Sequence, residues 1–266
     1  EDEGEEYTIT PEDSDRGASL ALDGKKPMPT QNSYIKAIAA LGKPMVVVLE
    51  GGSVIDLSSF GASVPAIVMA WYPGQSGGAA LGSLLFGKAN FSGKLPVTWP
   101  ASLADEPPFN GNGNTTQMSY YLGYRWFDNQ KKTPLYAFGH GLGYSTFEYS
   151  NLQVPCMTVT KGGVVTVTVD VKNTGTMDGD ETVFLFASWP GSTVPTRGAG
   201  YKELKGFTRA TIPAGMTARV PIPVRVSDLN YWDTASSAWK IDAGAVQVMV
   251  GPSSDKLTLT DTFTVQ

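Results

Sequence analysis

The sequence predicts two structural classes in succession: a partial α/β sandwich over residues 1–145, then an all-β sandwich over residues 146–266. Two observations support this division. Continuous apolar runs at 45–49 and 66–71 are each followed by turn residues and a helix-like segment, which is typical of parallel strands covered on both faces. Beyond residue 146, apolar and polar residues alternate with the period of two that marks half-buried strands.

The α/β region begins with a predicted helix over residues 31–41, where Ile35, Ile38 and Leu41 form one apolar stripe. Gly42 and Pro44 follow and end such a helix. We therefore expect a helix that buries this stripe just before the first strand.

The remaining α/β elements follow in the order strand, helix, strand, helix. Residues 45–49 predict the first strand, 53–60 a short helix, 66–71 the second strand, and 77–86 a helix rich in small residues. Two strands are too few for an open sheet with both faces covered. The rest of this sheet must come from elsewhere.

Residues 101–145 predict an irregular, aromatic-rich connector with many Pro, Gly and Asn residues. The alternation then starts with Val165, Val167, Val169 and Val171, and further strands are expected near 182–187, 218–226, 245–250 and 257–265. Several short alternating strands separated by turns indicate an antiparallel β-sandwich.

Composition excludes several classes of function. Twenty basic against 25 acidic residues give a net charge of −5, so no nucleic-acid partner is expected. A single cysteine, Cys156, excludes an internal disulfide, and a single histidine, His140, excludes a multi-histidine zinc site. No apolar run reaches the ~18 residues of a membrane span, so no membrane partner is expected either. Any chemistry therefore rests on carboxylates, without metal or cofactor.

Carboxylates crowd at Glu3, Glu5 and Glu6, beside Gly4 and Tyr7. A general acid needs a raised pKa, and neighbouring negative charges raise the pKa of a carboxyl group. Such acidic runs are also typical of solvated chain ends. From the residues alone, both interpretations stay open.

Other motifs carry weaker signals. His140 lies between glycines and could be a base, although a loop-anchoring role fits it better. Gly74–Gly78 could present backbone N–H groups to an anion or form a tight turn. Asp178–Glu181 lacks the ligand spacing of a calcium loop and predicts a polar lead-in to a strand. Asn90 and Asn114 open short glycosylation sequons.

Ordered motifs along nearly the whole chain carry a family resemblance. They are Asp15–Arg16, Lys43–Leu49, Trp71–Gln75, Leu84–Gly87, Ser92–Thr98, Leu122–Asp128, Phe138–Leu142, Thr146–Ser150, Val171–Gly175, Lys202–Phe207 and Val250–Ser254. Together they resemble the C-terminal portion of family-three glycoside hydrolases, the β-glucosidase and β-xylosidase group. The resemblance implies a barrel, an α/β sandwich and a fibronectin type III-like β-sandwich, of which this sequence shows the second half of the α/β sandwich and the β-sandwich.

The resemblance also implies a retaining mechanism with two carboxyl groups. Family members carry a nucleophilic aspartate on the barrel and a glutamate acid/base on a Gly-Glu-x-Tyr loop of the α/β sandwich. Gly4–Tyr7 aligns with that loop, which makes Glu5 the expected catalytic residue, with Glu3 and Glu6 as alternates. A retaining mechanism places the two carboxyl groups about 5–5.5 Å apart.

This sequence lacks the barrel and therefore the family's nucleophile. We expect it to work with an N-terminal barrel chain of the same precursor after proteolytic processing, and to act on a β-linked glucoside or oligosaccharide. The oligomeric state stays open, with a homo-oligomer as one alternative. We expect a secreted or periplasmic protein. A competing hypothesis is a non-catalytic carbohydrate-binding or cell-surface adhesion module, in which Trp189, Tyr201, Trp232 and Trp239 would present coplanar exposed rings.

Overall fold

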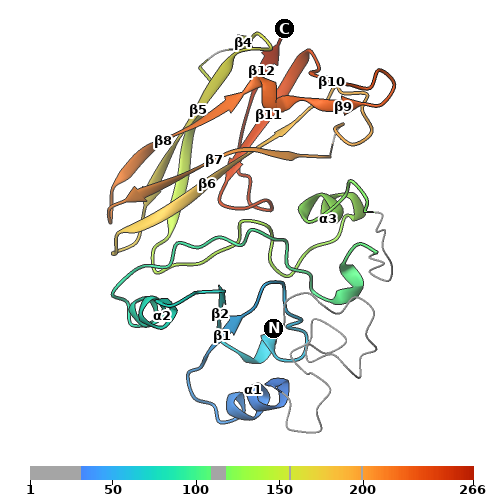
Figure 1. Ribbon diagram of the computed structural model, residues 1–266. Helices are drawn as coiled ribbons and strands as arrows, with labels where there is room; N and C mark the ends of the chain where they lie inside the picture. The colour runs from blue at the N-terminus through green and yellow to red at the C-terminus, as the bar shows by residue number, and fades with distance from the viewer. Residues whose placement is uncertain (1–30, 109–117, 156, 199) are drawn as a thin grey trace. The chain divides into compact units, whose positions relative to one another are not determined.

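The computed structural model of the chain describes residues 31–108, 118–155, 157–198 and 200–266 (Figure 1). The chain divides into two compact units. The first comprises Glu1–Gly82, Trp99–Leu122 and Lys132–Tyr136, and the second Ser83–Thr98, Gly123–Lys131 and Ala137–Gln266.

Two parallel strands form the centre of the first unit. Strand β1 (Val46–Glu50) pairs with β2 (Ala66–Trp71) in parallel, with Val46 opposite Ala66 and Leu49 opposite Met69. Both strands and their parallel pairing confirm the prediction from the two apolar runs. The helix α2 (Gly77–Leu85) follows β2 and confirms the small-residue helix.

The first helix is present, but its predicted buried stripe is wrong. Helix α1 spans Gln31–Ala39, and the side chains of Ile38 and Leu41 are 50% and 69% exposed. Ile35, the third residue of the stripe, is only partly buried, so the helical spacing is correct while the predicted burial of the stripe is not.

The helix predicted over residues 53–60 is also wrong. That segment is a turn-rich loop, followed by the short 3₁₀ helix η1 (Gly61–Ser63). Its polar groups are bound outside a helical pattern: Asp56 Oδ1 accepts a hydrogen bond from the Ser58 N–H, and the Ile55 carbonyl accepts one from Trp99 Nε1 at 2.9 Å. A short polar side chain that bonds its own backbone competes with helix formation.

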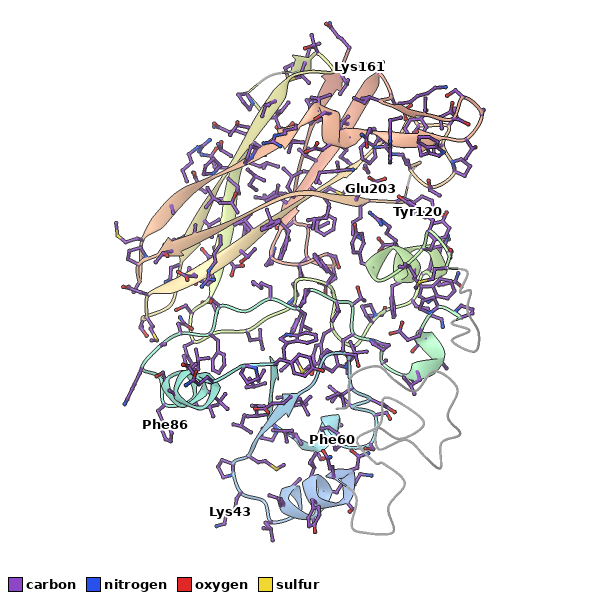
Figure 2. The ribbon with its side chains drawn as sticks, viewed as in Figure 1. Lys43, Phe60, Phe86, Tyr120, Lys161 and Glu203 are labelled. Atoms are coloured by element: carbon purple, nitrogen blue, oxygen red, sulfur yellow. The ribbon has the colours of Figure 1, made fainter. Side chains whose placement is uncertain are left out.

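The loop contributes three side chains, Ile55, Leu57 and Phe60, to the apolar core of the first unit. The buried apolar side chains of this unit are Val47, Leu49, Ile55, Leu57, Phe60, Val64 and Trp99. Phe60 is 2% exposed and lies inside the unit, close to η1 (Figure 2). The 3₁₀ helix η2 (Leu103–Asp105) completes the regular structure of this unit.

The second unit is a β-sandwich with sheets of five and three strands (Figure 1). The larger sheet has the order β4-β12-β11-β6-β7 and the smaller one β3-β5-β8. Their bounds are β3 Phe147–Gln153, β4 Thr158–Val159, β5 Val164–Asn173, β6 Gly179–Ser188, β7 Glu203–Ile212, β8 Thr217–Arg225, β11 Gly244–Gly251 and β12 Leu259–Val265. The 3₁₀ helix η3 (Val226–Leu229) leads into the hairpin of β9 (Tyr231–Asp233) and β10 (Ala238–Lys240).

The period-two pattern correctly predicts which residues face the sandwich core. Val165, Val167, Val169 and Val171 are fully buried on β5, and the residues between them are partly or fully exposed. The inward side chains of β6, β8, β11 and β12 join them in one apolar cluster. At roughly 25 cal/mol per Å² of apolar surface, this layer is the main stabilising element of the unit.

Part of the aromatic connector folds onto the sandwich as a helix that the sequence did not predict. Helix α3 spans Tyr124–Gln130. The ring of Tyr124 packs edge-on against Phe186 at 5.3 Å between centroids, and Phe138 packs against Phe184 at 5.5 Å. These aromatic contacts hold α3 and the segment around Phe138 against β6.

Among the described residues, no helix has the length and apolar character needed to cross a membrane.

Candidate functional site

The sequence-predicted catalytic residue, Glu5, lies outside the described residues, as do its alternates Glu3 and Glu6. Cys156 and Asn114 lie outside them too. The role of Glu5 therefore remains a prediction. Two other features of the structure bring polar side chains together, one in each unit.

The first feature is the carboxyl edge of the β1–β2 pair, where open α/β sheets bind ligands. Glu50 ends β1 and is exposed, and Trp71 ends β2 with a left-handed φ of 54°. The strand register shifts between Leu49 and Glu50, so the ladder is irregular at this point. A bulky residue with a positive φ is strained, and bulges of this kind re-aim side chains beside functional sites.

Tyr72 follows Trp71 and exposes an aromatic ring at the same edge. It is 60% exposed and crosses Gly52 so closely that a Cβ there would lie 2.7 Å from the Tyr72 hydroxyl oxygen. Gly52 leaves room for this approach, since a side chain at that position would push the Tyr72 ring aside. The edge presents a carboxylate and an exposed ring, two groups that can contact the hydroxyls and the C–H face of a sugar.

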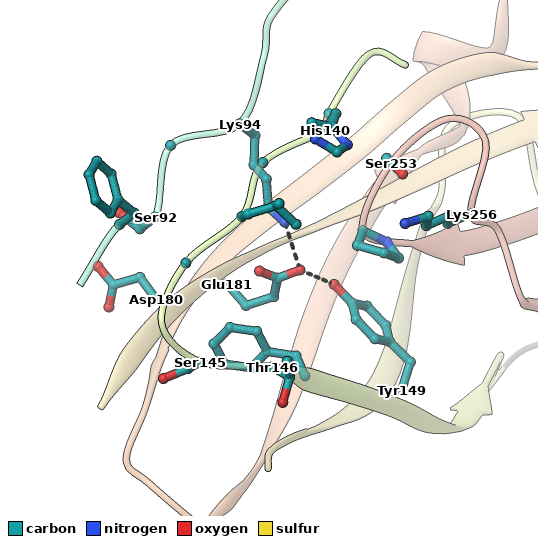
Figure 3. A pocket seen from close by; sticks show the side chains of 18 residues that line it. Ser92, Lys94, His140, Ser145, Thr146, Tyr149, Asp180, Glu181, Ser253 and Lys256 are labelled. Atoms are coloured by element: carbon teal, nitrogen blue, oxygen red, sulfur yellow. Dashed lines mark hydrogen bonds and ion pairs between the residues drawn. The ribbon is translucent and has the colours of Figure 1, made fainter. Parts of the chain in front are cut away.

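The second feature is a cavity of about 310 Å³ in the second unit (Figure 3). Segments 91–94 and 139–147, the start of β6 and the loop after β11 surround it. Its polar lining residues include Lys94, His140, Thr146, Tyr149, Asp180, Glu181, Ser253 and Lys256.

Glu181 is the centre of the polar network in this cavity. Its Oε1 accepts a hydrogen bond from Tyr149 at 2.6 Å and forms an ion pair with Lys94 Nζ at 3.1 Å. The Glu181 side chain is 4% exposed and that of Lys94 12%. Burial, followed by the charge of Glu181, raises the pKa of Tyr149, which keeps its hydroxyl protonated as a donor.

Local structure explains why a carboxylate is buried here. Glu181 shares the inward face of β6 with Val183 and Leu185, so the alternation of the strand directs it inward. Lys94 is fixed by its neighbour Leu95, whose N–H donates to the His140 carbonyl at 2.8 Å and whose carbonyl accepts from the Gly139 N–H at 2.8 Å.

The glycines around His140 allow this segment to run against residues 91–94. A Cβ on Gly141 would lie 2.1 Å from the Gly93 carbonyl oxygen, and one on Gly143 would lie 2.5 Å from the Phe91 carbonyl oxygen. The Gly-x-Gly-x-Gly pattern is therefore a packing requirement. His140 anchors the loop through its backbone, as the sequence analysis favoured.

Gly141→Ala should destabilise the chain by about 2 kcal/mol or more, because its methyl group can fit only if backbone moves. Gly93→Ala is the matched control, since a Cβ there meets no atom within 4 Å. Urea unfolding of both variants measures the difference. Equal stabilities would contradict the packing role assigned to Gly141.

His140 should titrate below the ordinary histidine value. Burial, then the positive charge of Lys256, lowers its pKa. The folded chain thus resists protonation of His140, so this group destabilises the fold as the pH drops below about 6.5 and has no such effect above it. Because the chain holds one histidine, its imidazole C–H resonances report the titration without overlap from a second histidine. Lys256→Met should move the midpoint upward; an unshifted midpoint of 6.5 in the parent chain would contradict the burial.

The sequence predicts Asp178–Glu181 as a polar lead-in to a strand, whereas β6 already begins at Gly179 and buries Glu181. Asp178 accepts from the Ala214 N–H, Asp180 pairs with Arg209 at 2.6 Å, and Glu181 pairs with Lys94. Thr211 and Arg209 lower the pKa of Asp180 by hydrogen bonding. Within the described part of the chain, no three His, Cys, Asp or Glu side chains gather as metal ligands would.

The sequon at Asn90 is occupied by internal hydrogen bonds. Its Nδ2 donates to Ser145 Oγ and to the Asp178 carbonyl, each at 2.9 Å, and its Oδ1 accepts from the Tyr144 N–H. A glycan on Nδ2 would break both donated bonds. Asn90 is thus a loop-bracing residue in the folded chain.

The turn at Gly74–Gly78 has the geometry of a tight connection. Gly74 has a φ of 69°, and a Cβ on Gly77 would lie 2.6 Å from Pro73 Cβ. Both glycines are needed for the turn itself. This favours the tight-turn interpretation over an anion site.

The aromatic residues of the sandwich form no coplanar platform. Trp189 is buried beneath the Arg197 guanidinium, 3.5 Å from the ring centroid. Trp232 and Trp239 are exposed, but their rings meet at 75°. This geometry weighs against the carbohydrate-binding module that the sequence left open.

The sequence patterns did not predict the buried ion pairs of the second unit. Arg197 is 1% exposed and pairs with Glu203, and the Lys94–Glu181 pair joins residues 87 positions apart. For Glu181 a signal existed: counting back in twos from Val183 along β6 places it inward.

The architecture defines a class: an α/β unit with a parallel strand pair, followed by a β-sandwich with sheets of five and three strands. The glycosyl hydrolase family 3 C-terminal domain matches residues 2–144, and the fibronectin type III-like domain matches residues 181–254. The chain belongs to glycosyl hydrolase family 3 and carries these two domains of it.

Known proteins of the family resemble the chain over most of its length. It is 34% identical to a thermostable β-glucosidase B of Acetivibrio thermocellus, over 88% of this chain and 31% of that protein. It is 34% identical to a xylan 1,4-β-xylosidase of Xylanibacter ruminicola, over 97% of this chain and 28% of that protein. The crystal structure of a family 3 β-glucosidase from Bifidobacterium adolescentis matches with a TM-score of 0.83 and 32% identity, over 95% and 37% of the two chains. The chain spans about a third of the length of the curated relatives it matches.

Proposed function

We propose that this chain supplies the general acid/base of a retaining β-glycosidase, with Glu5 as that residue and a β-linked glucoside as substrate. The nucleophilic carboxylate comes from a barrel-bearing portion of the same precursor. The observation that carries the proposal is the extent of the family match, which runs over residues 2–144 and so includes the Gly4–Tyr7 motif.

The chemistry needs two carboxyl groups at different stages. In the first step, the nucleophile on the barrel attacks the anomeric carbon while Glu5 donates its proton to the glycosidic oxygen, and the alcohol leaves. In the second step, Glu5 as carboxylate takes a proton from water, the water oxygen attacks the anomeric carbon, and the nucleophile is released. Glu5 ends the cycle protonated, as it began.

Exposed apolar side chains support the need for a partner portion. Ile38, Leu41 and Val46 of the first unit are 50%, 69% and 46% exposed. Large exposed apolar surface marks an interaction site. An edge strand such as β1 or β2 can also accept a further strand. The greater length of the relatives is consistent with a portion that covers these groups.

The test compares the chain alone with the chain joined to the barrel portion of its precursor, on an aryl β-glucoside. We expect hydrolysis with retention of configuration only in the joined protein, because one carboxylate cannot perform a double displacement. Hydrolysis by the 266-residue chain alone would overturn the proposed division of roles.

A further inference from the structure

We propose that the cavity around Glu181 is a binding site for a neutral, polyhydroxylated small molecule about the size of one sugar ring. The volume of about 310 Å³ lies at the lower end of the range of small-molecule sites, roughly 300–1,000 Å³. This proposal does not depend on the role assigned to Glu5, because the cavity is built entirely from residues of the second unit.

Glu181 offers an acceptor to such a ligand. Its Oε1 is occupied by Lys94 and Tyr149, while its Oε2, on the other side of the carboxylate, has no hydrogen-bond partner among the described residues (Figure 3). The Lys94 ion pair and the Tyr149 hydrogen bond fix the carboxylate in place before any ligand arrives. A fixed carboxylate oxygen accepts strong hydrogen bonds from hydroxyl groups.

Charge balance selects a neutral ligand. Both anions of the lining already have a cation, since Glu181 pairs with Lys94 and Asp180 with Arg209. Lys256 is the one lining charge without an ion-pair partner among the described residues, and it is exposed to solvent, which screens it. Burial and Lys256 lower the pKa of His140, which makes its ring a neutral donor and acceptor near pH 7. An anionic ligand would be repelled by the carboxylates of Asp180 and Glu181, and a cationic one by Lys94 and Lys256.

The rest of the lining suits the two chemical faces of a sugar. Ser253 and Thr146 add hydroxyl groups, and Lys256 adds an ammonium group without an ion-pair partner among the described residues. Phe91, Leu142 and Phe147 supply apolar surface for C–H groups. Polar groups that converge on a partly apolar cavity are what sites for small polar ligands use.

The single histidine provides a reporter inside the cavity. D-glucose is titrated into the 266-residue chain while the His140 imidazole proton is followed by NMR. We expect a saturable shift with a millimolar dissociation constant. Glu181→Gln should weaken binding by about tenfold, because a charged acceptor is replaced by a neutral one.

Lys256→Met is a second test variant, needed if Glu181→Gln fails to fold. Lys256 is exposed, and its replacement leaves the Lys94–Glu181–Tyr149 network intact. It should weaken glucose binding several-fold. Lys161→Met is the matched control, since Lys161 lies in the turn between β4 and β5 (Figure 2) and is not among the residues that line the cavity. It should bind glucose like the parent chain.

Binding of a charged sugar acid and of further variants separates the proposed neutral-ligand site from the alternatives. D-gluconate, which carries a carboxylate, should bind more weakly than glucose, and tighter binding of gluconate would overturn the proposal in favour of an anion site. No saturable His140 shift with glucose, or equal effects of Lys256→Met and Lys161→Met, would also overturn it. Glu5→Gln should leave the titration unchanged, so the result is separate from the proposed acid/base role.

Discussion

Glu5→Gln in the joined enzyme should lower the turnover of an alkyl β-glucoside by about 10²–10⁴-fold, the usual contribution of a positioned general acid. Glutamine keeps the shape of the side chain but has no proton to give to an alkoxide leaving group. Substrate binding should change little, because the loss falls on the chemical step. Steady-state kinetics of the parent and variant proteins measure both quantities.

Glu3→Gln and Glu6→Gln are the matched controls, because each removes one charge from the same seven residues. Both should stay close to the parent activity. A large loss in either control, with Glu5→Gln near normal, would move the acid/base role to that residue. Three nearly normal variants would refute an acid/base in this segment altogether.

Lys94→Met should have the largest effect on stability, lowering the free energy of unfolding by about 3 kcal/mol. It leaves the Glu181 carboxylate, 4% exposed, without its counter-ion, and removal of one partner of a buried pair typically costs about 3–5 kcal/mol. The hydrogen bond from Tyr149 remains, which places the expected value at the low end of that range.

Lys88→Met is the control for Lys94→Met, since Lys88 is exposed in the same segment and should change stability by less than about 0.5 kcal/mol. The double variant Lys94→Met/Glu181→Gln should be more stable than the sum of the single effects predicts, because the uncompensated charge is gone. Equal unfolding energies for Lys94→Met and Lys88→Met would show that the pair is not a stabilising contact.

Local patterns predict the parts of this fold that depend on local physics. The apolar runs at 45–49 and 66–71 identify both parallel strands, because short apolar runs bounded by turn residues favour strands. The double covering that such runs predict is not present in the described residues, where β2 has no buried residue. The alternation from Val165 to Val171 identifies β5 and its buried face, because successive side chains of a strand point to opposite faces of the sheet. The small-residue helix after Gly77 is also correct.

The features that the sequence patterns did not predict depend on contacts between residues far apart in the chain. Ile38 has helical spacing but is half exposed, since burial depends on a covering surface that the described residues do not supply. Residues 53–60 form a loop because Ile55 bonds to Trp99, 44 positions away. The buried pair of Lys94 and Glu181 depends on a contact 87 positions apart, which no local pattern specifies.

Azide rescue of Glu5→Ala in the joined enzyme tests the proposed acid/base role most directly. A 2,4-dinitrophenyl β-glucoside releases its leaving group without protonation, so the variant should form the glucosyl-enzyme and then stall for lack of a base. Azide, which needs no base, should attack the anomeric carbon, restore turnover and yield β-glucosyl azide. Unchanged turnover with azide, together with equal losses on the alkyl and dinitrophenyl substrates, would contradict Glu5 as the acid/base.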